Sequence, residues 1–179
     1  MKHWRLIVFA LVALAQLAVP ASLILKREQT LRHGSVWKFR TAPVDPVDAF
    51  RGRYVALEFE AEGQEIMPPE NLEFGETIFV TLRADAEGFA QIDQVSPTRP
   101  SGDGFIEAHL AGKTVSLPFD KYWVTERDAP AAEAAYRVQS RREKHNAFAT
   151  VRVYRGDAAL EQLYLDGQPL GEYLRANAK

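Results

Sequence analysis

Residues 77–95 read TIFVTLRADAEGFAQIDQV, and the pattern within them indicates the class of fold. The runs 77–83 and 89–95 are short and mix apolar with polar residues, as strands that bury one face do. Asp85 and Gly88 lie between the two runs and suit the tight loop of a β-hairpin. This region therefore predicts two antiparallel strands joined by a short loop.

Short alternating runs recur on both sides of this hairpin. Two more hairpins are predicted in the same way: 105–110 with 114–117 around the turn 111–113, and 148–154 with 159–165 around the turn 155–157. Residues 36–39 and 54–60 add further strands. In 54–60 (YVALEFE) the side chains of Val55, Leu57 and Phe59 share one face, which we expect to be buried.

Residues 128–142 differ from this pattern and predict a helix. Asp128 can act as the N-cap, Pro130 falls in the first turn, and Arg141 and Arg142 suit the C-terminal end of the helix dipole. The chain is therefore expected to be mainly β, a sandwich or small barrel built of antiparallel hairpins with one packed α-helix. Strand order cannot be derived from these patterns.

A long apolar segment precedes the predicted strands. Residues 6–25 read LIVFALVALAQLAVPASLIL, twenty residues without a charge. As a helix they would cover the ~30 Å hydrocarbon layer of a lipid bilayer at ~1.5 Å per residue. Lys2 and Arg5 precede the segment, and Lys26, Arg27 and Arg32 follow it. This predicts a transmembrane signal anchor at 6–25, between a short N-terminal tail (1–5) and a tether (26–34) that leads to a β-rich domain (35–179).

A cleavable signal peptide is the alternative interpretation, because Val19, Pro20 and Ala21 resemble a signal-peptidase site. Against it, the apolar run continues beyond that site to Leu25, as expected of an anchor. The charges leave the topology open, since three basic residues follow the segment and two precede it. The short cationic N-terminal tail is typical of an export signal, which would place the domain outside the cytoplasm.

The charge balance argues against nucleic acid as a partner. The chain holds 22 Lys and Arg against 24 Asp and Glu. Residues 26–179 carry 20 of these basic residues and all 24 acidic ones, a net charge of −4. A domain of this kind has no overall positive field to attract phosphates. Cysteine is absent, which excludes disulfides, thiolate metal sites and thiol catalysis.

No common catalytic or cofactor-binding motif is present. The four histidines, His3, His33, His109 and His145, lack the spacing of a zinc site. The glycine-rich phosphate loops and the serine-hydrolase elbow are missing as well. We therefore expect no metal and no cofactor. A Ser/Lys pair stays open, since Ser35, Ser96 or Ser116 could meet Lys38, Lys113 or Lys121 in space.

Residues 40–59, RTAPVDPVDAFRGRYVALEF, form the most unusual part of the sequence. A Pro/Asp-rich run leads through Arg-Gly-Arg into the strand predicted at 54–60. This segment resembles the GDYXXLXY protein family, which is named for a Gly-Asp-Tyr-x-x-Leu-x-Tyr motif. Gly52, Tyr54 and Leu57 match the motif. Arg53 stands where the family has Asp, and Phe59 stands where it has the last Tyr.

The resemblance implies a small bacterial protein with an N-terminal membrane anchor and an extracytoplasmic β-rich domain. Such proteins are often encoded beside a multi-spanning membrane protein, and the family has no assigned reaction. Because Arg53 inverts the charge of the family's Asp, a metal-binding or proton-handling role for that position is not expected here. Only structural roles carry over from the motif.

The motif segment has two interpretations. In the first it is a conformational signature that leads the chain into a strand, since Gly52 permits a positive φ in the turn. In the second it is an interaction surface, whose candidate residues are Asp45, Asp48, Arg51, Gly52, Arg53, Tyr54 and Leu57.

We therefore expect a non-catalytic accessory protein of the inner membrane, with its domain on the periplasmic side and a multi-spanning membrane protein as its partner. Two alternatives remain open at this point. One is an envelope hydrolase with a Ser/Lys or carboxylate site. The other is a secreted binding domain released by signal cleavage.

Overall fold

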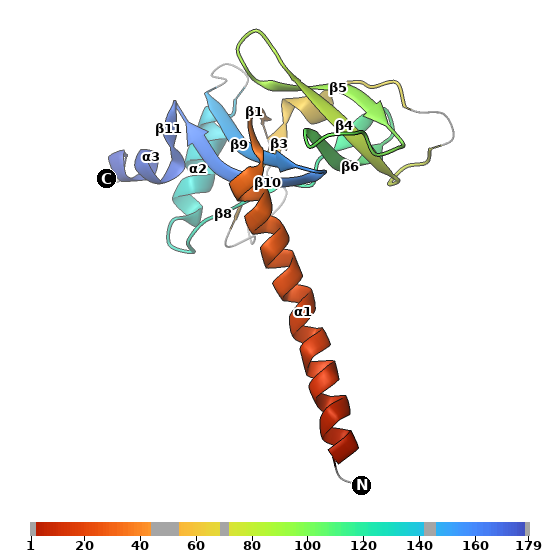
Figure 1. Ribbon diagram of the computed structural model, residues 1–179. Helices are drawn as coiled ribbons and strands as arrows, with labels where there is room; N and C mark the ends of the chain where they lie inside the picture. Colours follow the sequence, from red (N-terminus) through yellow and green to blue (C-terminus); the bar gives the residue numbers. More distant parts are fainter. Residues whose placement is uncertain (1–2, 44–53, 69–71, 142–145, 178–179) are drawn as a thin grey trace.

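The computed structural model describes residues 3–43, 54–68, 72–141 and 146–177 (Figure 1). A long helix, α1 (His3–His33), projects from a domain of antiparallel sheets and two shorter helices. The mainly β architecture with a helix and an N-terminal apolar helix agrees with the prediction from sequence.

The first helix is long and apolar enough to span a membrane. None of the residues in its most apolar part is buried against the domain. Pro20 lies inside the helix, a position that membrane helices tolerate better than soluble ones. Side chains such as Phe9 and Leu17 are 72% and 70% exposed, so the described part of the domain leaves them uncovered. A bilayer would cover them, which supports a single-pass membrane protein.

The segment 26–34, expected as a tether, is helical as far as His33. Gly34 alone separates α1 from the first strand, β1 (Ser35–Ala42). The end of the helix is fastened to the domain: Thr30 is buried, and the Lys26 Nζ lies 2.6 Å from the Asp157 Oδ1. The guanidinium of Arg152 also donates to the Gly34 carbonyl at 3.3 Å. The direction of α1 is therefore set by packing against the domain.

The tight junction at Gly34 leads to a testable prediction. A Cβ at this position would lie 2.4 Å from the Thr30 carbonyl oxygen, and that oxygen belongs to the backbone. Gly34→Ala is therefore expected to lower the free energy of unfolding by about 1–3 kcal/mol, as overpacking does. Urea denaturation of the full-length protein in detergent, followed by tryptophan fluorescence, measures the change. Gly171→Ala is the matched control, because a Cβ there meets no atom within 4 Å. Equal midpoints for the two variants would contradict the prediction.

The described strands form three sheets. The five-stranded sheet has the order β11 (Gln168–Pro169), β10 (Asp157–Leu165), β9 (Ala147–Tyr154), β1, β3 (Glu58–Phe59). The four-stranded sheet has the order β5 (Ala90–Ser96), β4 (Thr77–Ala84), β6 (Phe105–Ala111), β7 (Thr114–Ser116). The two-stranded sheet pairs β2 (Tyr54–Ala56) with β8 (Lys121–Trp123).

The three hairpins predicted from sequence are present as β4–β5, β6–β7 and β9–β10. Their turns carry the expected backbone: Gly88, Gly112 and Gly156 all have positive φ. At Gly156 the requirement is also spatial, since a Cβ would lie 2.9 Å from the Phe105 ring. The alternation of polar and apolar residues was sufficient to find these pairs because both strands of each lie close together in sequence.

The single strand predicted at 54–60 is wrong. The chain forms two short strands there, β2 and β3, and then a turn of 3-10 helix, η1 (Glu60–Gly63). Between the two strands the Leu57 N–H donates to the Asp120 carbonyl at 2.8 Å. β2 then pairs with β8, whereas β3 pairs with β1. Alternation cannot reveal this division, because all of 54–59 keeps one face buried while its backbone partners change.

The helix predicted at 128–142 is confirmed as α2 (Ala129–Gln139), with Pro130 in its first turn. Asp128 precedes it without capping it through its side chain, and its carboxylate accepts a hydrogen bond from the Thr125 hydroxyl at 2.7 Å. Tyr136 anchors the helix by donating to the Ala42 carbonyl at 3.1 Å.

The sequence did not predict β8, β11 or the seven-residue helix α3 (Leu170–Ala176), which are too short to show a period.

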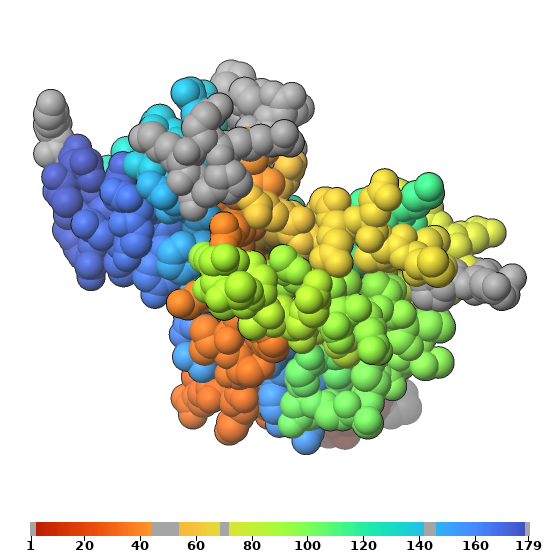
Figure 2. Space-filling view, turned by 90° about the horizontal axis from the view of Figure 1, so that it is seen from above, coloured from red at the N-terminus to blue at the C-terminus, as the bar shows by residue number. Residues whose placement is uncertain are grey.

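The sheets share one hydrophobic core. Phe39, Phe59 and Phe119 meet edge-on near its centre, with ring centroids 5.2–5.7 Å apart. Figure 2 shows the domain from above, with the yellow and green middle of the chain on one side, the blue C-terminal part on the other and orange β1 between them. Parallel bridges at Lys38–Phe89 and Ile106–Gly156 connect the two larger sheets.

Candidate functional site

Two of the seven candidate residues of the motif segment lie in the described part of the chain: Tyr54 and Leu57. Asp45, Asp48, Arg51, Gly52 and Arg53 lie outside the described residues. Leu57 is 3% exposed and belongs to the core. Tyr54 is half-buried and begins β2. The described part of the motif, 54–59, therefore places Leu57 inside the domain and Tyr54 at its surface.

Tyr54 joins an aromatic surface together with residues that lie almost 70 positions further along the chain. It pairs with Trp123 across β2 and β8, and the two rings meet edge-on with centroids 5.4 Å apart. The Lys121 Nζ lies 5.7 Å from the centre of the Tyr54 ring. Trp123 is 65% exposed, although an indole of this size is usually largely covered. We call Tyr54, Lys121 and Trp123 the aromatic patch.

The strands beneath the aromatic patch are held by the core. Val55 is 1% exposed, and its cross-strand partner Tyr122 points away from the patch. Tyr122 hydrogen-bonds with the Gln162 side chain and with the Leu163 backbone. Burial raises the pKa of Tyr122 above its ordinary value, so the phenol stays neutral. The β2–β8 pair that carries the aromatic patch is therefore held in place by the core.

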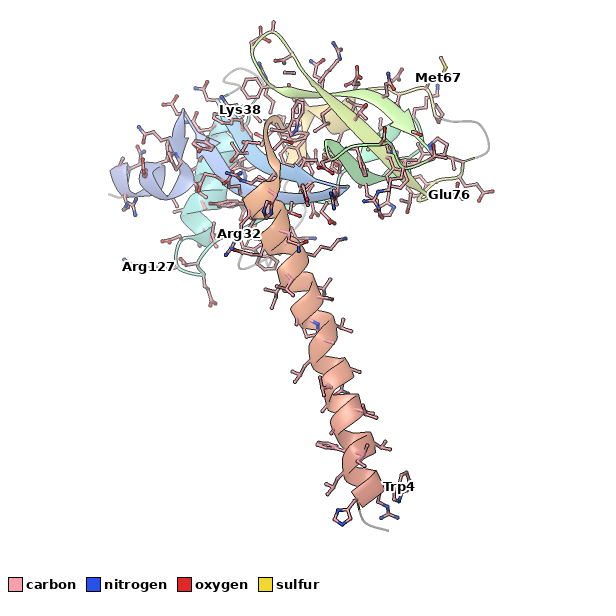
Figure 3. The ribbon with its side chains drawn as sticks, in the orientation of Figure 1. Trp4, Arg32, Lys38, Met67, Glu76 and Arg127 are labelled. Carbon is pink, nitrogen blue, oxygen red and sulfur yellow. The ribbon has the colours of Figure 1, made fainter. Side chains whose placement is uncertain are left out.

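The aromatic patch lies on the side of the domain from which the membrane helix projects. Figure 1 shows β8 low in the domain, on the side from which α1 extends. The segment after β8 extends further in the same direction, where Arg127 points downward at its tip (Figure 3). A bilayer that contains α1 would lie beneath this side of the domain.

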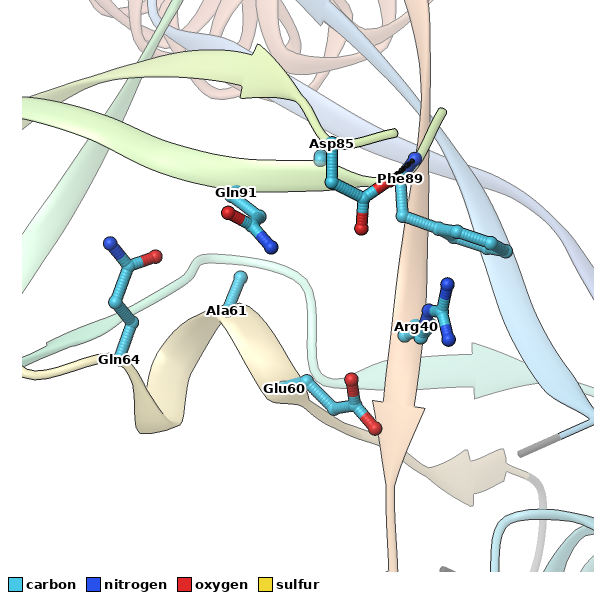
Figure 4. Close-up of a pocket in the computed structure, with 8 residues that line it drawn as sticks. Arg40, Glu60, Ala61, Gln64, Asp85, Phe89 and Gln91 are labelled. Carbon is cyan, nitrogen blue, oxygen red and sulfur yellow. Dashed lines mark hydrogen bonds between the residues drawn. The ribbon is translucent and has the colours of Figure 1, made fainter. Parts of the chain in front are cut away.

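A second group of side chains surrounds η1 and the hairpin loop between β4 and β5 (Figure 4). A cavity of about 280 Å³ lies between them, and its polar lining comes from Arg40, Glu60, Gln64, Asp85 and Gln91. Figure 4 shows the Glu60 carboxylate directed toward the Arg40 guanidinium.

Several of these groups have structural partners. The Arg40 guanidinium lies 4.1 Å from the centre of the Phe89 ring. The Asp85 carboxylate accepts the N–H groups of Glu87 and Phe89, which closes the loop. The amide of Gln64 both donates to the Ile92 carbonyl and accepts the Ile92 N–H. These contacts explain why the polar residues stand there without requiring a ligand.

A larger cavity of about 650 Å³ also borders η1, and three carboxylates line it: Glu58, Glu60 and Glu62. Glu62 accepts the Leu117 N–H at 2.8 Å and the Phe59 N–H at 3.2 Å. Burial raises the pKa of Glu62 against these two hydrogen bonds, and the charges of Glu58 and Asp120 raise it further. The sequence did not single out Glu62, because the N-cap position three residues before it is Phe59 and not the Ser or Thr of a capping box.

The described residues include no group of three or more His, Asp or Glu side chains that could hold a metal ion. The hydroxyl of Ser35 bonds with the Val153 carbonyl and the Trp37 indole, and that of Ser96 bonds with the Thr98 carbonyl. These two serines are therefore engaged with groups other than lysine.

The comparison with protein families gives one match. The model of the family described as GDYXXLXY protein matches residues 16–163, which is most of the chain. The chain belongs to the GDYXXLXY family. The match extends from the middle of α1 into β10 and so includes both the apolar helix and the domain. No curated protein and no solved structure matches the chain.

Membership assigns no reaction, so the described surface of this GDYXXLXY protein has to indicate its function. Within the described residues, the family motif contributes Leu57 to the core and Tyr54 to the aromatic patch. Trp123 and Lys121, which complete the patch, lie outside the motif. In the sequence, only the adjacent aromatic residues Tyr122 and Trp123 in a short polar segment could have drawn attention to Lys121 and Trp123.

Proposed function

We propose that this GDYXXLXY protein is a membrane-anchored, non-catalytic accessory protein that binds an integral membrane protein. α1 holds it in the inner membrane, and the domain lies on the periplasmic side, as the short cationic N-terminal tail favours. The anchor confines the domain to the layer above the membrane and raises its effective concentration near any partner there.

The exposed indole of Trp123 carries the proposal. Tryptophan, tyrosine and arginine dominate the binding energy of protein interfaces, because they combine a large apolar area with a polar group. Trp123 is 65% exposed yet is held by its edge-on contact with Tyr54, so it loses little side-chain freedom on binding. The position of β8 on the side of the domain from which α1 extends supports a partner whose own surface lies close to the bilayer (Figure 1).

The proposal predicts that removing the aromatic patch removes the partner. Full-length protein and its Tyr54→Ala/Trp123→Ala variant would be purified by affinity from detergent-solubilised native membranes. We expect one multi-spanning protein to be retained by the native chain and to fall at least ~10-fold with the variant, the effect of losing about 1.4 kcal/mol of binding free energy.

Phe74→Ala provides the matched control, since Phe74 is an aromatic residue that is 82% exposed elsewhere on the domain. It should leave the retention of the partner unchanged. Retention of the same protein by the patch variant, or equal losses with both variants, would show that the patch is not the binding surface. A thermal midpoint within a few degrees of the native value confirms that the patch variant is folded.

A second candidate function, a hydrolase with a carboxylate site, is favoured by the larger cavity. Three glutamates line it, and the raised pKa of Glu62 suits a general acid. Against this function, both carboxylate oxygens of Glu62 already accept backbone N–H groups. Hydrolysis of ester, amide or glycoside probes that is lost with Glu62→Gln, at unchanged stability, would favour the enzyme over the accessory role.

A further inference from the structure

A cavity of about 400 Å³ lies at the junction of α1 with the domain. Lys26, Gln29 and His33 form its helical wall, and they share one face of α1 because they are three and four residues apart. Arg99, Glu107 and the segment 154–157 line the opposite side. We call this space the junction cavity. It is distinct from the aromatic patch and from the two cavities beside η1.

The helical wall of the junction cavity lies at the depth of lipid headgroups if residues 6–25 fill the hydrocarbon layer. Lys26 is the first residue after that apolar run. The headgroup region adds ~5–7 Å on each side of the hydrocarbon, which corresponds to ~4 residues of helix. Lys26 and Gln29 therefore fall within the headgroup region. This step rests on the membrane anchorage that forms part of the proposed function.

The far wall of the cavity is held in place by hydrogen bonds. Arg155 has a φ of 53°, a left-handed backbone conformation that residues other than glycine rarely adopt. Its N–H donates to the Asp103 carbonyl at 2.9 Å, and its Nε donates to the Asp103 carboxylate at 2.9 Å. Arg99 donates to the Arg155 carbonyl at 2.7 Å. Four more N–H groups of the Arg99 guanidinium and four of the Arg155 guanidinium remain for other acceptors.

The charges that line the junction cavity have both signs. Lys26, Arg99 and Arg155 provide three cations in a domain whose net charge is negative, and Glu107 and Asp157 provide two carboxylates. Asp157 pairs with Lys26 at 2.6 Å, whereas Glu107 makes no ion pair within the described part of the chain. The two arginines and Glu107 thus offer a binding place for one anionic and one cationic group.

We propose that the junction cavity binds the headgroup of phosphatidylethanolamine, with the phosphate against Arg99 and Arg155 and the ammonium against Glu107. Guanidinium groups bind phosphate through paired N–H donors. A primary ammonium donates hydrogen bonds to a carboxylate, which the quaternary ammonium of phosphatidylcholine cannot do. A free phosphate or a phosphatidylglycerol headgroup would leave Glu107 facing an anion without compensation.

In the test, the full-length protein in detergent is mixed with equal amounts of phosphatidylethanolamine, phosphatidylcholine and phosphatidylglycerol. Native mass spectrometry then identifies the lipids that the protein retains. We expect the native chain to favour phosphatidylethanolamine at least ~5-fold over phosphatidylcholine, and Arg99→Gln to lower its retention about tenfold, the scale of one charge-assisted hydrogen bond. Glu107→Gln should shift the preference toward phosphatidylglycerol. Arg83→Gln is the matched control, an exposed arginine on β4 that bonds to Gln91.

Three results would overturn the proposal. They are equal retention of the three lipids by the native chain, equal retention by the Arg99→Gln and Arg83→Gln variants, and displacement of the lipid by millimolar inorganic phosphate. The third would identify a site for free phosphate. Thermal midpoints of the variants establish that they are folded.

Alkaline carbonate extraction of native membranes tests the anchorage separately. Release of the protein from the membranes would refute the anchorage on which the inference depends. Protein that stays in the membrane yet shows no lipid preference would refute the junction cavity alone. The partner purification described above concerns the aromatic patch and does not depend on the junction cavity.

Discussion

Replacing Phe59 with alanine is expected to lower the free energy of unfolding by about 3–5 kcal/mol, the usual cost of removing a buried phenylalanine ring. Phe59 is 2% exposed, and its ring meets both Phe39 and Phe119 edge-on. The three rings come from β1, from β3 and from the segment before β8. Loss of the Phe59 ring would leave a void at the place where these three elements, which are distant in sequence, pack together.

Phe59 is also the last position of the family motif, where the family has a tyrosine. The effect of Phe59→Ala therefore tests whether this position serves the core. Urea denaturation of the full-length protein in detergent measures the change through tryptophan fluorescence, to which Trp37 contributes from its place against the core. Phe59→Tyr restores the family residue and retains the ring. It should cost much less than alanine, because the ring keeps its contacts with Phe39 and Phe119.

A loss below ~1 kcal/mol with Phe59→Ala would contradict this account, since it would mean that the ring triad contributes little to the core. Loss of partner binding by Phe59→Tyr at full stability would place the motif's last position in an interaction surface. Trp123→Ala is expected to behave in the opposite way, with a change in stability within about 1 kcal/mol, because its ring is mostly exposed.

The class of fold could be predicted because its main elements are local. Each hairpin has both strands within about twenty residues, and the alternation of side chains and the turn glycines together specify the pairing. The same patterns could not predict the division at Leu57, since its N–H bonds to Asp120, more than sixty positions away. They also could not predict β8, whose three residues are too few to show a period.

The candidate sites depended even more on contacts between distant residues. The sequence singled out Tyr54, but Trp123 becomes its neighbour only through the pairing of β2 with β8. The Arg155-Gly156-Asp157 tripeptide was predicted as a hairpin turn, which the structure confirms. Its place beside α1 was not predictable, because the expected tether at 26–34 gave no reason to pack the helix on this turn. Side chains that form a cavity between such elements cannot be found by spacing.

Replacing Glu62 with alanine is the second change that we expect to lower the free energy of unfolding strongly. Its carboxylate accepts the N–H groups of Phe59, in β3, and of Leu117, in the segment between β7 and β8. Glu62→Ala would leave both donors without this acceptor, at about 1–3 kcal/mol for each buried donor. Because η1 is half-exposed and water can replace part of the loss, we expect the free energy of unfolding to fall by about 2–4 kcal/mol. Glu65→Ala, a change at an exposed glutamate two residues after η1, should stay within ~0.5 kcal/mol of the native value.

The pH dependence of stability separates the carboxylate's charge from its hydrogen bonds. Burial raises the folded-state pKa of Glu62 above its ordinary value of 4.5, so the folded state holds this proton more tightly than the unfolded chain does. The stabilising contribution of the protonated group is therefore complete below pH 4.5 and is lost as the pH rises through the folded-state pKa. The native chain should lose stability relative to Glu62→Gln across this interval, because glutamine does not titrate.

Urea midpoints of the native chain and of Glu62→Gln between pH 4 and pH 7.5 provide the measurement. Glutamine can accept only one of the two N–H groups, so the Glu62→Gln variant should be less stable than the native chain at low pH. The difference between their free energies of unfolding should narrow as the pH rises. A gap that widens with pH would mean that the ionised carboxylate is favoured in the folded state, and that the two backbone hydrogen bonds outweigh burial. In that case Glu62 would hold η1 as a carboxylate, and the case for a general acid in the larger cavity would lose its physical basis.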